Sequence, residues 1–333
     1  MKFISKQTPL VSVFCCWTFI FFVCLVVFIN SFLKSKWTIK DSCKRGSLKG
    51  PLEYDDPYVL NILQENFMTP PSTLPYNLSD PKVSGFKRFS WPFIHNYVKY
   101  FFQDQTHGFF MEAGALDGEF ISNTLWLEYY KNWSGILLEP DANTFKHLTW
   151  KRRKSWIANT CISATNYPKE TLFASQFNVV KGLPFPWLYR ANTFEITSNT
   201  ARGFDFSTWS RRIAYSGIQC FPLTSYLLAL NVTTLDFLSL DTQGNEWGIL
   251  KTVFDAGKIK VRAIVVEHYP TGEMNILDPE FVNYMKNSGY YYVDCDSEPN
   301  YFFILKEDKI LLEKARIYER KGHKKYCNTT FME

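Results

Sequence analysis

Short apolar runs alternate with amphipathic stretches through the C-terminal two thirds of the chain, and this pattern limits the possible folds more than any other feature. Runs separated by helical patterns of about 10 to 15 residues are typical of βαβ units, which build a parallel sheet. The expected parallel strands cover residues 109–113, 134–139, 155–161, 235–241 and 261–267. Two more runs, 290–294 and 301–305, follow each other so closely that they require a tight reversal. The sequence therefore predicts an α/β fold, with a mostly parallel sheet and a C-terminal antiparallel hairpin.

A long stretch without regular periodicity, about 163–220, interrupts this alternation. The alternating part is expected to form one domain over residues 92–310, which begins with an aromatic-rich helix at about 92–102. Residues 34–91 are rich in turn formers and are expected to form a stem, followed at the other end of the domain by a basic C-terminal tail at 311–333. A hydrophobic content of 46% excludes an intrinsically disordered chain.

An uncharged apolar run of twenty residues lies near the N-terminus, from Leu10 to Ile29. A helix of about 20 apolar residues spans the ~30 Å hydrocarbon core of a bilayer. A cleaved signal peptide is the alternative, but its apolar region is usually ~7–15 residues long and ends at a small-residue cleavage site. This run instead continues through Leu33 into lysines. We therefore expect a transmembrane signal anchor at residues 10–33, behind a short tail at 1–9, and hence a single-pass membrane protein.

The orientation of the expected anchor depends on two opposing signals. Five basic residues follow it closely, while only Lys2, Lys6 and the α-amino group precede it. By the positive-inside rule this keeps the main domain in the cytosol. Four Asn-x-Ser/Thr sequons instead favour a lumenal glycoprotein; they lie at Asn77, Asn132, Asn231 and Asn328.

Charge and cysteine spacing argue against a nucleic-acid partner and a metal site. The net charge of +5, from 37 Lys+Arg and 32 Asp+Glu, comes from local clusters of mixed sign. The sequence contains no Cys-x-x-Cys spacing and no Cys/His cluster. An odd number of cysteines outside the anchor leaves at least one unpaired within the chain, and the pairing is open; these are Cys43, Cys161, Cys220, Cys295 and Cys327.

Acidic side chains stand at the ends of the expected parallel strands, where ligands bind in open α/β sheets. The first strand leads into E-x-G-x-x-D-G at residues 112–118, but Leu116 occupies the second glycine position of the dinucleotide-binding fingerprint, which disfavours a dehydrogenase. Glu139 ends the second strand and can accept hydrogen bonds from both ribose hydroxyls of a nucleoside. A carboxylate in the first turn suits a cationic sulfonium better than a pyrophosphate, so we expect S-adenosylmethionine (SAM). The candidate SAM-binding residues are Glu112, Gly114, Asp117, Gly118, Glu139 and Asn159.

Three further polar residues are candidates for catalysis. Asp241 and Glu246 flank the start of a helix in the pattern D-x-x-G-x-E, and His268 follows Glu267 at the end of a strand. A histidine in that place can act as a general base for an acceptor hydroxyl. All these residues also have a structural interpretation, because acids cap helix starts and complement the helix dipole, and a lone histidine often serves packing. Methyl transfer from a sulfonium requires no metal.

Four segments resemble the FkbM-type methyltransferase domain: GFFMEAGALDGEFISNTLWLE, WSGILLEPD, LDFLSLDTQGNEWGILK and AIVVEHY. They are more similar still to the arthropod Star-like subgroup, over roughly residues 55–305. The resemblance implies a Rossmann-like, class I SAM-dependent methyltransferase fold and O-methylation of a small molecule or glycan. Ser239, Gln243 and Asn245 depart from the residues common in the family, which bears on acceptor handling more than on SAM binding. The SAM loop, the ribose-binding acid and the D-x-x-G-x-E block are matched at Glu112, Gly114, Gly118, Glu139, Asp241, Gly244 and Glu246.

The resemblance to the Star-like subgroup also implies a cellular role. It implies a type II membrane protein of the endoplasmic reticulum and Golgi, with a lumenal domain that helps membrane-anchored EGF-receptor ligands leave the endoplasmic reticulum. Two functions therefore stay open. One is a membrane-anchored O-methyltransferase, and the other is a catalytically inactive methyltransferase fold that acts as a trafficking factor for such cargo.

Overall fold

The computed structural model describes residues 52–79, 90–179, 189–196, 213–269, 278–296 and 300–321. The expected signal anchor at 10–33 lies outside these residues, as do the tail at 1–9 and the sequon at Asn328. Within the described ranges, no helix is both long enough and apolar enough to cross a bilayer.

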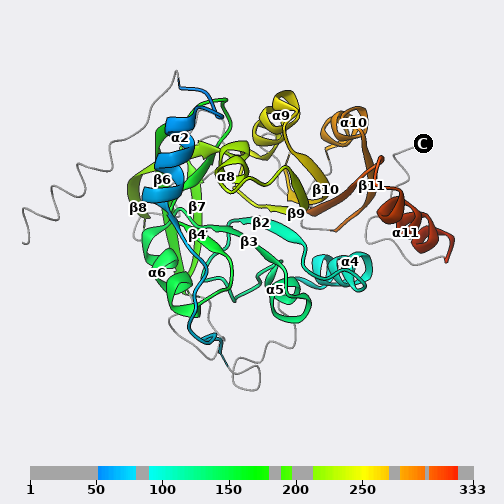
Figure 1. The fold of residues 1–333 in the computed structure, drawn as a ribbon, viewed down its shortest axis with the longest axis horizontal. Helices are drawn as coiled ribbons and strands as arrows, with labels where there is room; N and C mark the ends of the chain where they lie inside the picture. The colour runs from blue at the N-terminus through cyan, green and yellow to red at the C-terminus, as the bar shows by residue number, and fades with distance from the viewer. Residues whose placement is uncertain are drawn as a thin grey trace, which may run out of the picture. The chain divides into compact units, whose positions relative to one another are not determined.

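Eight strands form the larger sheet, in the order β1-β4-β3-β2-β9-β10-β12-β11 (Figure 1). The strands β4, β3, β2, β9 and β10 pair in parallel, while β1 pairs antiparallel with β4. β12 runs antiparallel between β10 and β11, so the hairpin places its second strand inward. The predicted α/β fold, with its mostly parallel sheet and C-terminal hairpin, is confirmed. The strand bounds are Met68–Thr69 (β1), Phe109–Ala113 (β2), Ser134–Leu138 (β3), Trp156–Ala158 (β4), Thr234–Leu240 (β9), Lys260–Glu267 (β10), Tyr290–Cys295 (β11) and Asn300–Leu305 (β12).

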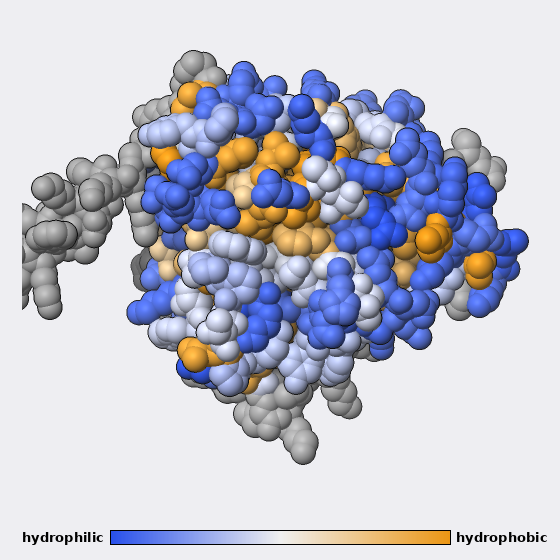
Figure 2. All heavy atoms as spheres, in the orientation of Figure 1, coloured by the Kyte–Doolittle hydropathy of each residue, from blue (hydrophilic) through white to orange (hydrophobic). Residues whose placement is uncertain are grey.

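Helices cover both faces of this sheet (Figure 1). Alternate residues of a strand point to opposite faces, so Phe110 of β2 packs in one core and Met111 in the other. Because both faces are buried, the strands are apolar almost throughout. The view in Figure 2 shows a mostly hydrophilic surface, with apolar side chains gathered over α8 and the strands beside it. One layer contains α4 (Pro92–Phe102), α5 (Leu125–Lys131), α6 (Ala142–Lys151) and α11 (Lys309–Arg320), and the other contains α2 (Pro57–Ile62), the π-helix η1 (Leu63–Phe67), α8 (Leu223–Ala229), α9 (Glu246–Ala256) and α10 (Pro279–Asn287).

Parts of the predicted stem and tail are built into the core. The stem range, 34–91, contains α2, η1 and β1, and their residues Val59 and Leu63 are fully buried. The tail range, 311–333, begins inside α11, where Leu311 is 1% exposed. These contacts form because each helix is amphipathic and packs its apolar face against the sheet.

A second sheet is formed by β5 (Cys161–Ser163), β6 (Lys169–Val179), β7 (Tyr189–Glu195) and β8 (Ile213–Pro222), in the order β5-β8-β6-β7. Three of its strands, β6, β7 and β8, lie in the stretch that shows no regular periodicity in the sequence. Its strands have one exposed face, so Leu172 of β6 is exposed while Phe173 is buried, and no continuous apolar run results. A disulfide joins Cys161 to Cys220, which are directly paired residues of β5 and β8.

Candidate functional site

A cleft opens at the carboxyl ends of β2, β3, β9 and β10, and residues of the second sheet form part of its wall. It contains about 830 Å³ of empty space, open solvent at the mouth included. Three carboxyl groups line it, those of Glu139, Asp241 and Glu267. Among the described residues, no lysine, arginine or histidine lines this cleft. The lining therefore favours a neutral or cationic ligand over an anion.

The loop after β2 bends at two glycines with positive φ. Gly114 has a φ of 83°, and a Cβ atom there would overlap the backbone oxygen of Asp241. Gly118 has a φ of 76°, and a Cβ atom there would overlap Leu148 of α6. Both glycines are thus required by contacts within the protein, because a side chain would displace β9 or α6. Gly114 also lines the cleft, whereas Gly118 is buried and does not line it.

Glu112 holds the end of this loop in place. Its carboxylate accepts hydrogen bonds from the Ser122 hydroxyl at 2.8 Å, from the backbone N–H of Asn123 at 2.7 Å and from the Thr124 hydroxyl. Burial raises the pKa of Glu112, and the nearby Arg153 guanidinium opposes the rise. The residue lines a smaller cavity that shares several wall residues with the cleft.

Asp117 and Asn159 also bond to the backbone rather than line the cleft. Asp117 Oδ1 accepts hydrogen bonds from the N–H groups of Glu119 and Phe120, at 2.9 and 2.7 Å. Asn159 Nδ2 donates to the backbone oxygen of Glu139 at 2.8 Å. Both side chains fix loops whose neighbouring residues form the wall.

Glu139, the predicted ribose-binding acid, follows β3 and lies in the cleft wall. Its carboxylate accepts hydrogen bonds from the backbone N–H groups of Leu116 at 3.0 Å and Asp141 at 2.9 Å. Burial raises the pKa of Glu139 to about 8 despite these bonds. Leu116, Pro140 and Ile162 supply apolar surface in the same cleft. Because a carboxylate has about four acceptor positions, this group can also accept the two hydroxyls of a ribose.

Asp241 and Glu267 lie at the ends of the adjacent strands β9 and β10 and share a hydrogen bond. The side chain of Gln243 donates to Asp241 Oδ1 at 2.6 Å, and the Tyr269 hydroxyl donates to Glu267 Oε1 at 2.6 Å. Burial and the neighbouring Asp241 carboxylate raise the pKa of Glu267 to about 9. A carboxyl group whose pKa is raised beside a second carboxylate in a cleft is a frequent feature of acid–base sites.

The other two predicted catalytic residues do not line the cleft. Glu246 Oε1 and Oε2 accept the backbone N–H of Gly244 at 3.0 and 3.1 Å, which closes the turn before α9. His268 Nε2 lies 3.1 Å from Asp278 Oδ2, and its ring packs on Phe281 with centroids 4.2 Å apart. Burial lowers the pKa of His268. The structure thus brings Asp241, but neither Glu246 nor His268, together with Glu139.

Several residues of the cleft wall are not predicted from the sequence. Thr160 follows β4, and Phe173 and Thr193 come from the second sheet. Trp91 lines the cleft just before α4 and is 44% exposed. Glu267 is also absent from the predicted site residues. The sequence does mark it as a candidate, because it is an acid at the end of an expected parallel strand.

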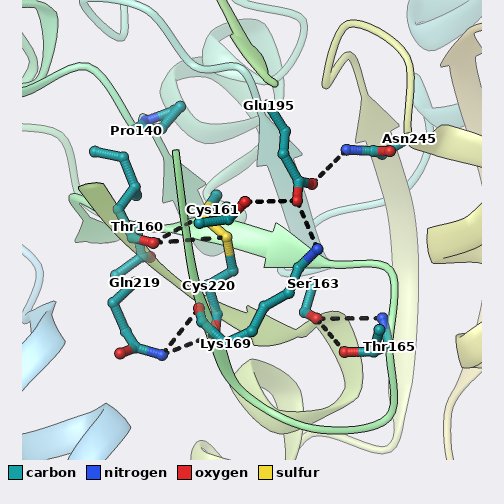
Figure 3. Close-up of a disulfide and its surroundings, with 12 residues drawn as sticks. Pro140, Thr160, Cys161, Ser163, Thr165, Lys169, Glu195, Gln219, Cys220 and Asn245 are labelled. Atoms are coloured by element: carbon teal, nitrogen blue, oxygen red, sulfur yellow. Dashed lines mark hydrogen bonds and ion pairs between the residues drawn. A yellow bond between two sulfur atoms is a disulfide. The ribbon is translucent and has the colours of Figure 1, made fainter. Parts of the chain in front are cut away.

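A disulfide within the second sheet and an ionic cluster around Glu195 lie next to the cleft (Figure 3). Cys161, bonded to Cys220, lines the cleft directly. Glu195, at the end of β7, accepts hydrogen bonds from Lys169 Nζ at 2.6 Å and from Asn245 Nδ2 at 2.7 Å. Asn245 belongs to the loop after β9, so this contact links the two sheets at the cleft.

Comparisons with known proteins give one family. The model of the methyltransferase FkbM domain matches residues 112–292. No curated protein matches the chain. Among solved structures, the METTL16 methyltransferase domain aligns at 12% identity and a TM-score of 0.36, covering 84% of this chain and 92% of that one. Phosphoethanolamine N-methyltransferase 2 of Haemonchus contortus, in complex with SAM, aligns at 10% identity and a TM-score of 0.29, covering 80% of this chain and 50% of that one.

Proposed function

Because the chain belongs to the FkbM methyltransferase domain family, we propose that it is a SAM-dependent methyltransferase with a class I fold. Bound SAM supplies an electrophilic methyl group on its sulfonium. The acceptor is a hydroxyl group of a small molecule or glycan, as the sequence resemblance implies. The observation that carries this proposal is the position of Glu139 in the wall of the same cleft as Asp241.

The residues of the cleft fit this cofactor. Glu139 has the acceptor capacity for the ribose hydroxyls, and Leu116 and Ile162 offer apolar surface to the base. The lining has three acidic side chains and, among the described residues, no basic one, which suits a cationic sulfonium. The contribution of the protein is then chiefly positional, because holding two reactants in line removes much of the entropic cost of their encounter.

Calorimetric titration of the full chain in detergent micelles tests this function. We expect SAM to bind with micromolar affinity, and Glu139→Ala to weaken binding at least about tenfold, because it removes the hydrogen bonds to two ribose hydroxyls, which contribute about 0.5–1.5 kcal/mol each. Glu280→Ala, which removes an exposed carboxylate outside the cleft, is the control. A folded chain that does not bind SAM, or that binds it equally well without Glu139, contradicts the proposal.

We also propose that the domain lies in the lumen of the endoplasmic reticulum or Golgi, held by the anchor at 10–33. The Cys161–Cys220 disulfide supports an oxidising compartment, and Cys295 is also disulfide-bonded. This location requires that SAM, which is made in the cytosol, be carried into the lumen.

The resemblance to the Star-like subgroup supports a second function. In it, the methyltransferase fold binds membrane-anchored growth-factor cargo and assists its export from the endoplasmic reticulum. Co-precipitation of a membrane-anchored EGF-receptor ligand with the full chain tests this function. Association that survives Glu139→Ala favours the trafficking role, and association that requires Glu139 and SAM ties the role to the cofactor site.

A further inference from the structure

Asp241 and Glu267 form a closely coupled carboxyl pair in the cleft. In the register of β9 and β10, Leu240 pairs with Val266. Asp241 and Glu267 are the next residues, so their backbones lie at the same level on neighbouring strands, which are about 4.8 Å apart. Both side chains line the cleft, and they are hydrogen-bonded to each other. The topology of a parallel sheet, rather than a chance approach of loops, therefore sets this geometry.

The pair holds one proton and one negative charge at neutral pH. Two carboxyl groups in hydrogen-bond contact do not both ionise, because like charges disfavour each other. Burial and Asp241 raise the pKa of Glu267 to about 9, which makes Glu267 the protonated member. The hydrogen bonds from Gln243 and Tyr269 hold one oxygen of each group. The described lining of the cleft offers no cationic side chain to balance the charge.

We propose that the Asp241–Glu267 pair is the counter-charge for the cationic methyl donor and the group that receives the proton of the acceptor hydroxyl. This inference rests on the proposed function and deepens it, since it assigns two side chains to the chemistry. It also restricts the acceptor to an uncharged hydroxyl compound, because the pair repels a phosphate or carboxylate.

Charge is balanced on both sides of the reaction. A sulfonium donor supplies the methyl group, which the acceptor oxygen gains as it loses its proton, while the sulfur keeps the electron pair of the broken carbon–sulfur bond. Asp241 takes that proton, and Glu267 keeps its own. An anionic pair facing a cation becomes a neutral pair facing a neutral thioether. The cleft thus never contains an uncompensated charge, which is costly away from water. The proton passes to water when the products leave.

Other acids are less suited to this role. Glu139 accepts two backbone N–H groups on the nucleoside side of the cleft. Glu246 is bonded through both oxygens to the turn before α9, and His268 is held by Asp278 outside the cleft.

Binding of SAM and S-adenosylhomocysteine by the full chain in detergent tests the charge of the pair. The two ligands differ by one methyl group and one positive charge. Wild type and Glu267→Gln retain the ionised Asp241 and are expected to bind SAM at least about tenfold more tightly than S-adenosylhomocysteine. Asp241→Asn leaves only Glu267, whose pKa is raised chiefly by burial, and is expected to lose most of this preference. The double variant loses the charge, so the ratio should fall to about one while the affinity for S-adenosylhomocysteine stays unchanged.

Three outcomes overturn the inference. They are a wild type that binds SAM and S-adenosylhomocysteine equally well, a double variant that still prefers SAM, and a double variant that no longer binds S-adenosylhomocysteine. The proposed function survives each of these, whereas a wild type that binds neither ligand overturns both. For the proton role, Asp241→Asn is expected to slow tritium transfer from labelled SAM to solubilised membranes at least about 100-fold; transfer at the wild-type rate overturns it.

Discussion

Asn245 Nδ2 lies 2.7 Å from Glu195 Oε2, and this hydrogen bond connects the two sheets of the domain at the cleft. Glu195 is 3% exposed and also accepts hydrogen bonds from Lys169 and from the Thr171 hydroxyl. A buried carboxylate with these partners holds β7 next to the loop that carries Asp241. The second sheet is therefore a structural part of the site.

Asn245→Ala should loosen this connection. It leaves the buried carboxylate of Glu195 one hydrogen bond short, at a cost of about 1–3 kcal/mol in the free energy of unfolding. We also expect weaker SAM binding, since Asn245 lines the cleft. Urea unfolding and calorimetry measure the two effects, with Asn61→Ala as control because Asn61 is exposed on α2. Equal stability of the two variants would show that the contact is dispensable.

Arg153 should be far more critical for folding. Arg153 Nε lies 3.0 Å from Glu128 Oε1, both side chains are fully buried, and Arg153 also donates to the backbone oxygen of Gly118. Arg153→Met leaves Glu128 buried without its cation, which typically costs about 3–5 kcal/mol. The double variant Arg153→Met, Glu128→Leu should recover much of that loss. A double variant no more stable than Arg153→Met contradicts this account.

The sequence predicts the larger sheet well because its strands are buried on both faces and appear as continuous apolar runs. It also places Glu139 and Asp241 correctly at strand ends, since parallel strands bring their carboxyl ends to one edge. The second sheet is missed because its strands have one exposed face and therefore show no continuous apolar run. Consequently Phe173 and Thr193, which complete the cleft, have no signal in the sequence.

Side-chain direction limits the prediction of the site more than element placement does. Glu112 and Asn159 stand at predicted strand ends and Asp117 in the predicted first turn, yet their polar atoms bond to nearby loops. Glu246 turns back onto the backbone of Gly244. Spacing alone does not distinguish a carboxylate that caps a turn from one that faces a ligand, because both need the same place on the chain.

The ligand-free domain should lose stability as pH rises. Burial raises the pKa of Glu139 from its usual 4.5 to about 8, so the folded chain holds a proton that the unfolded chain releases. The corresponding stabilisation is complete below about pH 4.5 and is lost as pH rises through 8. The slope is at most about 1.4 kcal/mol per pH unit for one group. Urea unfolding at pH 5, 7 and 9 measures it, and Glu139→Gln should reduce the slope, with the remainder due in part to Glu267, while Glu280→Gln should leave it unchanged. Identical profiles for the two variants would remove Glu139 as the cause.

The disulfide should be required for both stability and ligand binding. Cys161 and Cys220 are 59 residues apart in sequence, and a cross-link over about 60 residues stabilises by about 4 kcal/mol in the chain-entropy model. Because Cys161 lines the cleft, its replacement also loosens the wall. Cys161→Ser with Cys220→Ser should therefore lower the melting temperature and weaken SAM binding. An unchanged affinity would confine the disulfide to a stabilising role.

Three of the sequons are exposed in the described part of the domain, at Asn77, Asn132 and Asn231, and the two that lie after helices give a direct test of its compartment. Asn132 follows α5 with a φ of 55°, and Asn231 lies in the turn after α8 with a φ of 56°; both side chains are exposed. Exposed turns tolerate a bulky glycan, so a lumenal domain should carry one at each position. Glycosidase treatment should then increase electrophoretic mobility, and Asn132→Gln and Asn231→Gln should each remove one step of the shift, whereas Asn61→Gln should remove none. If the untreated chain already migrates at its polypeptide mass, the domain faces the cytosol, as the basic residues after the anchor suggest.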